Sequence, residues 1–91
     1  MSKVLEGIRV LDFGRYIAGP FCGTLLGDMG AEVIRIEKVD GSEDRFLSPV
    51  TENGDGAMFM QLARNKRGMT LNPMKPQGRE IVKKLVATAD V

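Results

Sequence analysis

A glycine-rich turn is the part of the sequence best suited to bind a ligand. Residues 14–23, GRYIAGPFCG, follow directly on the apolar run of residues 8–13. Two glycines followed by Pro20 are typical of a turn that opens a helix. The N–H groups and the dipole at a helix N-terminus attract anions. The stretch therefore predicts either a site for a phosphorylated ligand or a simple reversal of the chain.

The turn matches the dinucleotide-binding motif G-x-G-x-x-G only in part. Gly14 and Gly19 fill the outer positions, and Glu37 follows at about the distance expected of a ribose-binding acid. The middle glycine of the motif lets the backbone approach a pyrophosphate, and this position holds Tyr16. Because a phenol side chain obstructs that approach, the sequence does not favour a nicotinamide or flavin site.

Three glycines in the expected helix lie four residues apart and share one face: Gly19, Gly23 and Gly27. Each glycine inside a helix costs about 1 kcal/mol relative to alanine. This cost indicates that something approaches the glycine face closely. A sheet packed against the helix and a bound ligand are both open at this point.

The other reactive side chains exclude several kinds of chemistry within these residues. The 91 residues include no histidine and one cysteine. They hold neither a Ser-His or Cys-His pair nor a disulfide, and no metal site is expected. Cys22 falls in the first turn of the expected helix, where we interpret it as a small buried residue. Arg64, Lys66 and Arg67 form a basic cluster that either neutralises phosphate, binds a neighbouring chain or lies in a solvated loop.

The overall charge and hydropathy limit the partners of the chain. A net charge of +1 creates no general field that attracts nucleic acid or an anionic membrane, and neither partner is expected. No apolar run is long enough to span a membrane, and the N-terminus lacks a signal-peptide pattern. With its single cysteine, the chain is expected to be cytoplasmic.

The elements that would position these residues describe an α/β chain. Residues 8–13 and 31–36 predict buried strands, and residues 20–29 predict the helix between them, with Pro20 as its first residue. Such a βαβ unit implies parallel strands. Residues 38–56 predict a long loop, 57–63 a short helix and 68–71 a short strand. A last helix opens at Pro76 and carries an apolar stripe made of Ile81, Val82, Leu85, Val86 and Ala89.

Ordered motifs across nearly the whole chain resemble one enzyme family. They are Leu5-x-Gly7-x-x-Val10-Leu-Asp-Phe13, Ala18-Gly-Pro20, Leu26-x-x-x-Gly30-Ala-Glu-Val-Ile34-x-Ile-Glu37, Asn65-Lys-Arg67 and Ala89-Asp-Val91. In this order they resemble the N-terminal portion of the family III coenzyme A transferases of the CaiB/BaiF type. That family includes formyl-CoA and carnitine CoA-transferases and the α-methylacyl-CoA racemases.

The resemblance implies a large Rossmann-like parallel-sheet domain, of which residues 1–91 form an incomplete N-terminal fragment, in an interlocked homodimer. It also implies an enzyme that moves coenzyme A between carboxylic acids. In that family an aspartate takes the acyl group and then becomes a CoA thioester. The aspartate is expected beyond Val91, so no catalytic residue is assigned, and the 91-residue chain alone is expected to be inactive. Acyl-CoA and carboxylates are the implied substrates, with no permanently bound cofactor.

The resemblance also implies ligand contacts. Residues before the Ala-Gly-Pro turn line the CoA site in that family, which implies Ile17 and Ala18. A basic residue after the second strand meets CoA phosphate, which implies Lys38. The segment around the third strand touches the nucleotide end of CoA in that family, which implies Leu71, Asn72, Pro73 and Met74. A lysine at the carboxyl end of a strand can meet phosphate as a point charge, although most lysines are simply solvated.

Two other functions stay open. A racemase or epimerase of the same fold would act next to a thioester through an acid–base pair rather than a nucleophile. A noncatalytic CoA-binding or assembly module would need neither. In each case an open sheet edge predicts marginal stability for these residues alone.

Overall fold

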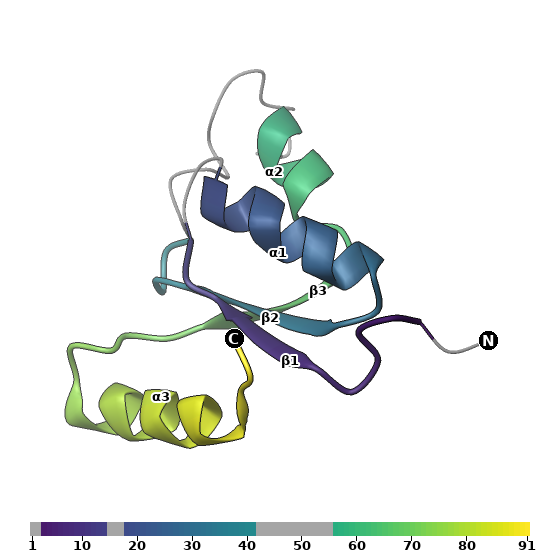
Figure 1. The fold of residues 1–91 in the computed structure, drawn as a ribbon. Helices are drawn as coiled ribbons and strands as arrows, with labels where there is room; N and C mark the ends of the chain where they lie inside the picture. Colours follow the sequence, from purple (N-terminus) through teal and green to yellow (C-terminus); the bar gives the residue numbers. More distant parts are fainter. Residues whose placement is uncertain (1–2, 15–17, 42–55) are drawn as a thin grey trace.

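The computed structural model describes residues 3–14, 18–41 and 56–91 (Figure 1). Its centre is one parallel sheet with the strand order β1-β2-β3. The strands are β1 (Arg9–Asp12), β2 (Glu32–Glu37) and β3 (Lys66–Thr70). In register, Val10 lies opposite Val33, and Val33 lies opposite Lys66. All three strands therefore end at one edge of the sheet, which we call the carboxyl edge.

Helices cover both faces of this sheet. They are α1 (Ala18–Asp28), α2 (Ala57–Leu62) and α3 (Pro76–Thr88). Figure 1 shows α1 and α2 on one face and α3 on the other. Thr24 of α1 is fully buried, and its hydroxyl lies within hydrogen-bonding reach of the carbonyl oxygens of Pro20 and Leu62, which links α1 to α2.

The six elements confirm the α/β fold class predicted from sequence, with boundaries that differ by at most two residues. Helix α1 begins at Ala18, so Pro20 is its third residue rather than its first. The first helical turn accepts proline because its N–H groups have no partner within the helix. Strand β3 begins at Lys66, two residues earlier than the apolar pattern indicated.

The last residues of the chain pair with β1 on the side opposite β2. The N–H groups of Asp90 and Val91 donate to the Arg9 carbonyl, at 2.9 and 3.2 Å, and Leu11 N–H donates to the Val91 carbonyl at 2.9 Å. The chain thus runs outward from β1 to β3 and returns through α3 to the other side of β1. Backbone pairing therefore continues on both sides of β1, and in open α/β sheets ligands bind at the carboxyl ends of the strands where the chain turns back in this way.

The core lies between α1 and the sheet. It contains buried Val10, Ala31 and Val33, packed against half-buried Leu5, Ile8 and Leu26. Val33 is only 1% exposed, and a Cβ added at Gly27 would lie 3.4 Å from its side chain. The glycine face of α1 is therefore the face that packs on the sheet, which decides between the two interpretations of the glycine spacing.

The apolar stripe on α3 is less buried than its periodicity suggests. Val82 and Leu85 are half-buried, whereas Ile81 is 38% and Val86 55% exposed. Among the described strands, α3 packs mainly against β1 and so buries only part of its stripe.

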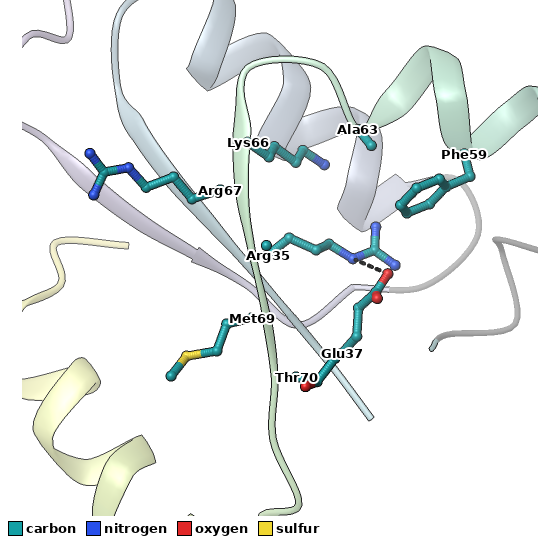
Figure 2. Close-up of a pocket in the computed structure, with 9 residues that line it drawn as sticks. Arg35, Glu37, Phe59, Ala63, Lys66, Arg67, Met69 and Thr70 are labelled. Atoms are coloured by element: carbon teal, nitrogen blue, oxygen red, sulfur yellow. Dashed lines mark ion pairs between the residues drawn. The ribbon is translucent and has the colours of Figure 1, made fainter. Parts of the chain in front are cut away.

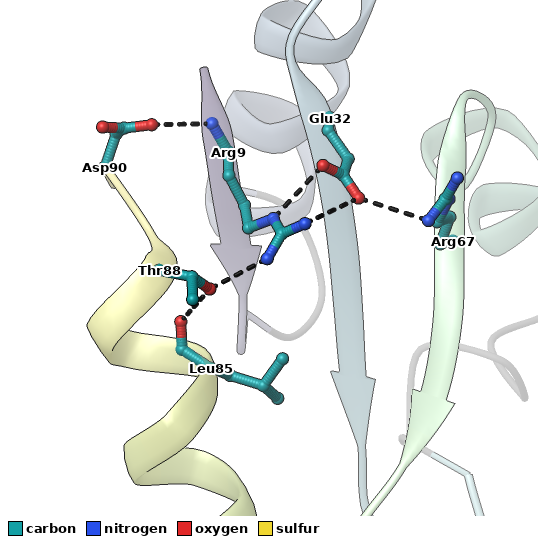
Figure 3. Close-up of polar contacts among 6 residues, drawn as sticks. All are labelled: Arg9, Glu32, Arg67, Leu85, Thr88 and Asp90. Carbon is teal, nitrogen blue, oxygen red and sulfur yellow. Dashed lines mark hydrogen bonds and ion pairs between the residues drawn. The ribbon is translucent and has the colours of Figure 1, made fainter. Parts of the chain in front are cut away.

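Polar contacts fix the opposite, amino end of the sheet (Figure 3). Glu32 accepts hydrogen bonds from Arg9 Nε at 3.2 Å and from Arg67 Nη1 at 3.3 Å, which ties the three strands together. Arg9 Nη1 also donates to Thr88 Oγ1 at 2.8 Å, and the backbone N–H of Arg9 donates to Asp90 Oδ2 at 2.9 Å. Each of these partly exposed contacts stabilises the fold only slightly, but together they hold the end of α3 beside β1.

Candidate functional site

The carboxyl edge collects every predicted ligand contact that the structure describes. Ala18 begins α1 after the loop that follows β1, and Lys38 comes directly after β2. Residues 71–74 come directly after β3, and Leu71 N–H donates to the Glu37 carbonyl at 2.9 Å. Ile17 lies outside the described residues. That Ala18, Lys38 and residues 71–74 contact CoA stays a prediction. The topology nevertheless brings their segments to one edge of the sheet, as binding of one ligand requires.

Gly14, which follows β1, and Gly19, in the first turn of α1, touch each other. A Cβ added at Gly14 would lie 2.9 Å from the Cα of Gly19, so neither position has room for a side chain. Asp12 Oδ1 accepts a hydrogen bond from Gly14 N–H at 2.8 Å and fixes the start of the loop. We call this close contact of Gly14 with Gly19 the neck of the β1–α1 loop.

A buried ion pair lies beneath this neck. Lys66 Nζ lies 2.7 Å from Asp12 Oδ2, and the side chains are 1% and 4% exposed. The same Nζ donates to the Pro20 carbonyl at 2.8 Å. Lys66 therefore joins the start of β3 to the end of β1 and to the first turn of α1. The sequence analysis missed this pair, although a charged residue at the end of a buried strand was a signal that it needs a buried partner.

The basic cluster predicted from sequence is divided among three carboxylates. Lys66 is buried against Asp12, Arg67 Nη1 lies 3.3 Å from Glu32, and Arg64 Nη2 lies 2.8 Å from Asp28. These three cations therefore do not form one phosphate-binding surface, and Lys66 does not lie in a solvated loop. The structural reason is that the acids on β1, β2 and α1 face them at short range.

The turn before β3 is anchored to the end of α1. Asp28 Oδ1 accepts a hydrogen bond from Asn65 Nδ2 at 3.0 Å, next to its contact with Arg64. The hydrogen bond from Arg64 lowers the pKa of Asp28 below its usual 3.8, and the same contact raises the pKa of Arg64. Asn65 adopts a φ of 61°, a left-handed conformation that asparagine tolerates better than most residues. These contacts set where β3 begins.

Lys38 occupies an exposed position at the end of β2. The Gly41 N–H donates to the Lys38 carbonyl at 2.9 Å and closes a turn, and Gly41 has a φ of 90°. This turn fixes the backbone of Lys38, and the exposed side chain has the length and charge to reach a phosphate at the carboxyl edge.

The segment after β3 is held by packing and hydrogen bonds at its start, while Pro73 and Met74 are exposed. Leu71 is buried, and Asn72 Oδ1 accepts a hydrogen bond from Met74 N–H at 3.0 Å. Gly78, in the first turn of α3, packs directly against the Asn72 carbonyl. Met74 is 80% exposed, so the segment offers a ligand this side chain and backbone groups, but little of Leu71.

A shallow groove of about 210 Å³ runs beside the β1–α1 neck. Its walls include Leu11, Phe13, Cys22, Leu26 and Val91. Cys22 is exposed rather than buried, which corrects our interpretation of it. The reason is that the glycine face of α1 occupies the side of the helix next to the sheet.

A larger cavity of about 360 Å³ lies along β3 (Figure 2). In it, Glu37 lies 3.8 Å from Arg35 Nε, and the Phe59 ring centre lies 5.7 Å from Arg35 Cζ. Because Glu37 is 4% exposed and placed beside Arg35, it does not resemble the ribose-binding acid of a dinucleotide site. Met60 of α2 is 56% exposed, whereas Phe59 and Leu62 are half-buried.

The fold and the carboxyl edge together define a Rossmann-like α/β protein whose chain returns through α3 to the far side of β1. Residues 5–91 match the model of CoA-transferase family III, so the chain belongs to this family. The resemblance seen in the sequence is therefore confirmed.

Named relatives of the chain are CoA-transferases. The chain is 43% identical over 90 residues to succinyl-CoA:glutarate CoA-transferase of Mus musculus, covering 98% of the chain and 21% of the relative. It is 45% identical over 89 residues to the beta subunit of succinyl-CoA–L-malate CoA-transferase of Chloroflexus aurantiacus, covering 96% of the chain and 22% of the relative.

A solved structure confirms the fold. The crystal structure of a CAIB/BAIF family protein from Brucella suis superposes with a TM-score of 0.89 at 37% identity, covering 99% of this chain and 25% of that one. The chain thus spans about a fifth to a quarter of the proteins it matches. In the part of the chain that the structure describes, no helix could cross a membrane, and no group of acidic or cysteine side chains could hold a metal ion.

Proposed function

We propose that the protein, at its full natural length, transfers coenzyme A between carboxylic acids, and that the carboxyl edge binds part of CoA. The observation that carries this proposal is the convergence of the start of α1, Lys38 and residues 71–74 at the carboxyl edge of the sheet. Membership of CoA-transferase family III supports it.

The chemistry of the edge suits a molecule that carries a pyrophosphate and a 3′-phosphate. The N-terminus of α1 offers N–H groups and the positive end of the helix dipole. Lys38 supplies a positive charge after β2. The groove beside Phe13 and Leu26 offers apolar walls for the uncharged arm of CoA. Phosphates would therefore bind across the strand ends while the arm lies along β1.

For the reaction itself we propose an aspartate nucleophile outside residues 1–91. Its carboxylate attacks the thioester carbonyl of the donor, which releases CoA thiolate and leaves an acyl-aspartyl anhydride. The thiolate then attacks the aspartyl carbonyl, which releases the donor acid and leaves an enzyme-bound CoA thioester. The acceptor carboxylate attacks the carbonyl of the enzyme-bound thioester, which releases CoA thiolate and leaves an anhydride between the acceptor and the aspartate. The thiolate then attacks the acceptor's carbonyl, which forms the new acyl-CoA and releases the aspartate carboxylate. Asp12 and Asp28 do not suit this role, because each faces a cation at short range.

The first test is detection of the covalent intermediate. Incubating the natural-length protein with succinyl-CoA, the donor named for two of the relatives, should add the mass of CoA to the enzyme less one water. Acceptors such as glutarate and malate should then discharge the enzyme and yield their CoA esters. If no donor in a panel of acyl-CoA thioesters charges the enzyme, the transferase proposal is wrong. Exchange of the substrate's α-hydrogen with deuterated water, without transfer, would indicate the racemase instead, and CoA binding without either reaction would indicate the binding module.

The second test concerns the phosphate contact. Lys38→Ala should weaken CoA binding by about tenfold, since a hydrogen bond to a charged group contributes at least this factor. Titration calorimetry with CoA measures the loss, and binding of pantetheine, which lacks the phosphates, should be unaffected. Lys83→Ala is the matched control, because Lys83 lies on α3 with a 75% exposed side chain. If the Lys38 and Lys83 variants bound CoA with equal affinity, Lys38 would not be part of the CoA site.

A further inference from the structure

The buried pair of Asp12 and Lys66 has a position that stability alone does not explain. The two side chains are 4% and 1% exposed, and taking both charges out of water costs much of what their attraction returns. Apolar residues of similar volume generally stabilise a core at least as well as a buried ion pair does. The residues around this pair instead make room for it: a Cβ at Gly23 would lie 3.1 Å from Asp12 Oδ2 and 3.3 Å from Lys66 Nζ.

The contacts of the pair converge on the neck of the β1–α1 loop. Asp12 uses one oxygen for Lys66 and the other for Gly14 N–H, at the start of the loop. Lys66 uses its ammonium group for Asp12 and for the Pro20 carbonyl, just after the loop. One ion pair therefore holds both ends of the loop, and charge-assisted hydrogen bonds fix its direction in a way that apolar packing does not.

We propose that Asp12 and Lys66 are a positioning pair, which holds Gly14 and the N-terminus of α1 in the arrangement that binds the phosphorylated ligand. Lys66 acts through Asp12 and Pro20 and does not itself contact phosphate, because it is buried beneath α1. As far as CoA is the ligand, this inference rests on the proposed function. It assigns the Asn65-Lys66-Arg67 motif a role in shaping the site rather than in neutralising charge.

The test separates positioning from stability by removing both charges together. In the natural-length protein, Lys66→Met alone leaves a buried carboxylate and should lower stability. The double variant Asp12→Leu/Lys66→Met buries no charge and should unfold near the wild-type denaturant concentration. If the pair positions the loop, the double variant nevertheless binds CoA at least about tenfold more weakly, the factor of one lost charge-assisted hydrogen bond. Its Gly14 amide should also exchange with deuterium faster, relative to global unfolding, than in the wild type.

Each outcome decides the proposal. A double variant that binds CoA as tightly as the wild type, or whose Gly14 amide exchanges at the wild-type rate, overturns it. Should the double variant not fold, Asp12→Asn replaces it, and unchanged CoA affinity in that isosteric variant overturns the proposal equally. If the wild-type protein binds no CoA, the proposed function fails, and the Gly14 exchange rate, which needs no ligand, still decides whether the pair holds the loop. Lys83→Met serves as the control for loss of a lysine.

Discussion

Replacing Gly78 by alanine is expected to destabilise the protein by about 2 kcal/mol and to displace residues 72–74. An added Cβ would overlap the carbonyl oxygen of Asn72 and lie 3.4 Å from the Cα of Pro73. Because the obstacle is backbone, it cannot rotate away. We take a cost of about 3 kcal/mol for overpacking, less about 1 kcal/mol that alanine returns through its higher helix propensity. Urea denaturation monitored by circular dichroism measures the difference.

Gly68→Ala is the matched control for Gly78→Ala. Gly68 lies in β3, and among the described residues no atom lies within 4 Å of a Cβ added there. This variant should remain within about 0.5 kcal/mol of the wild type. Since residues 72–74 are part of the proposed CoA site, Gly78→Ala should also weaken CoA binding, whereas Gly68→Ala should not. Equal stability of the two variants would show that α3 does not pack against the Asn72 carbonyl as described.

Replacing Gly23 by leucine is expected to cost about 3 kcal/mol of stability, the lower end of the range for breaking a buried ion pair. Gly23 faces the sheet directly over Asp12 and Lys66, with 3.1 to 3.3 Å between its Cβ position and their side-chain atoms. A leucine there must lift α1 from the sheet or separate the pair, and either change leaves charge without its partner. Thermal and chemical denaturation of the purified variant measure the loss.

Cys22→Leu is the control next to Gly23 in the same helix. Cys22 is exposed, so leucine at that position meets solvent rather than the sheet. Helix propensity is improved in both variants, which leaves the buried contact as the difference between them. If Cys22→Leu destabilised the protein as much as Gly23→Leu, the glycine face of α1 would not be the face against the sheet.

Local pattern was enough to predict the elements, while the residues of the proposed site were predicted from the resemblance to the family. Residues 31–36 are aliphatic enough to predict a buried strand, and they correspond to β2 within one residue at each end. Because parallel strands share a carboxyl edge, the order of the elements also placed Lys38 and residues 71–74 near each other. The start of β3 was missed, since Lys66 and Arg67 resemble the end of a polar loop. Only their acidic partners on β1 and β2 allow them to begin a strand.

What the sequence could not supply was the identity of distant partners. The spacing of Gly23 and Gly27 indicated that something lies close to α1, but not that it is Val33, Asp12 and the side chain of Lys66. These residues are separated by up to 54 positions along the chain. Likewise the charges of Arg64 and Arg67 were evident, whereas their pairing with Asp28 and Glu32 depends on how α1 and the strands are packed.

The parallel arrangement gives the sheet two unlike ends. Arg9, Glu32 and Arg67 crosslink the strands where they begin, while the loops that follow the strands are left for recognition. Adaptation to heat and adaptation to a new ligand at the proposed site could therefore proceed through separate sets of substitutions. Substitutions near the start of a strand would then reflect adaptation to heat, and substitutions after its end would reflect adaptation to the ligand.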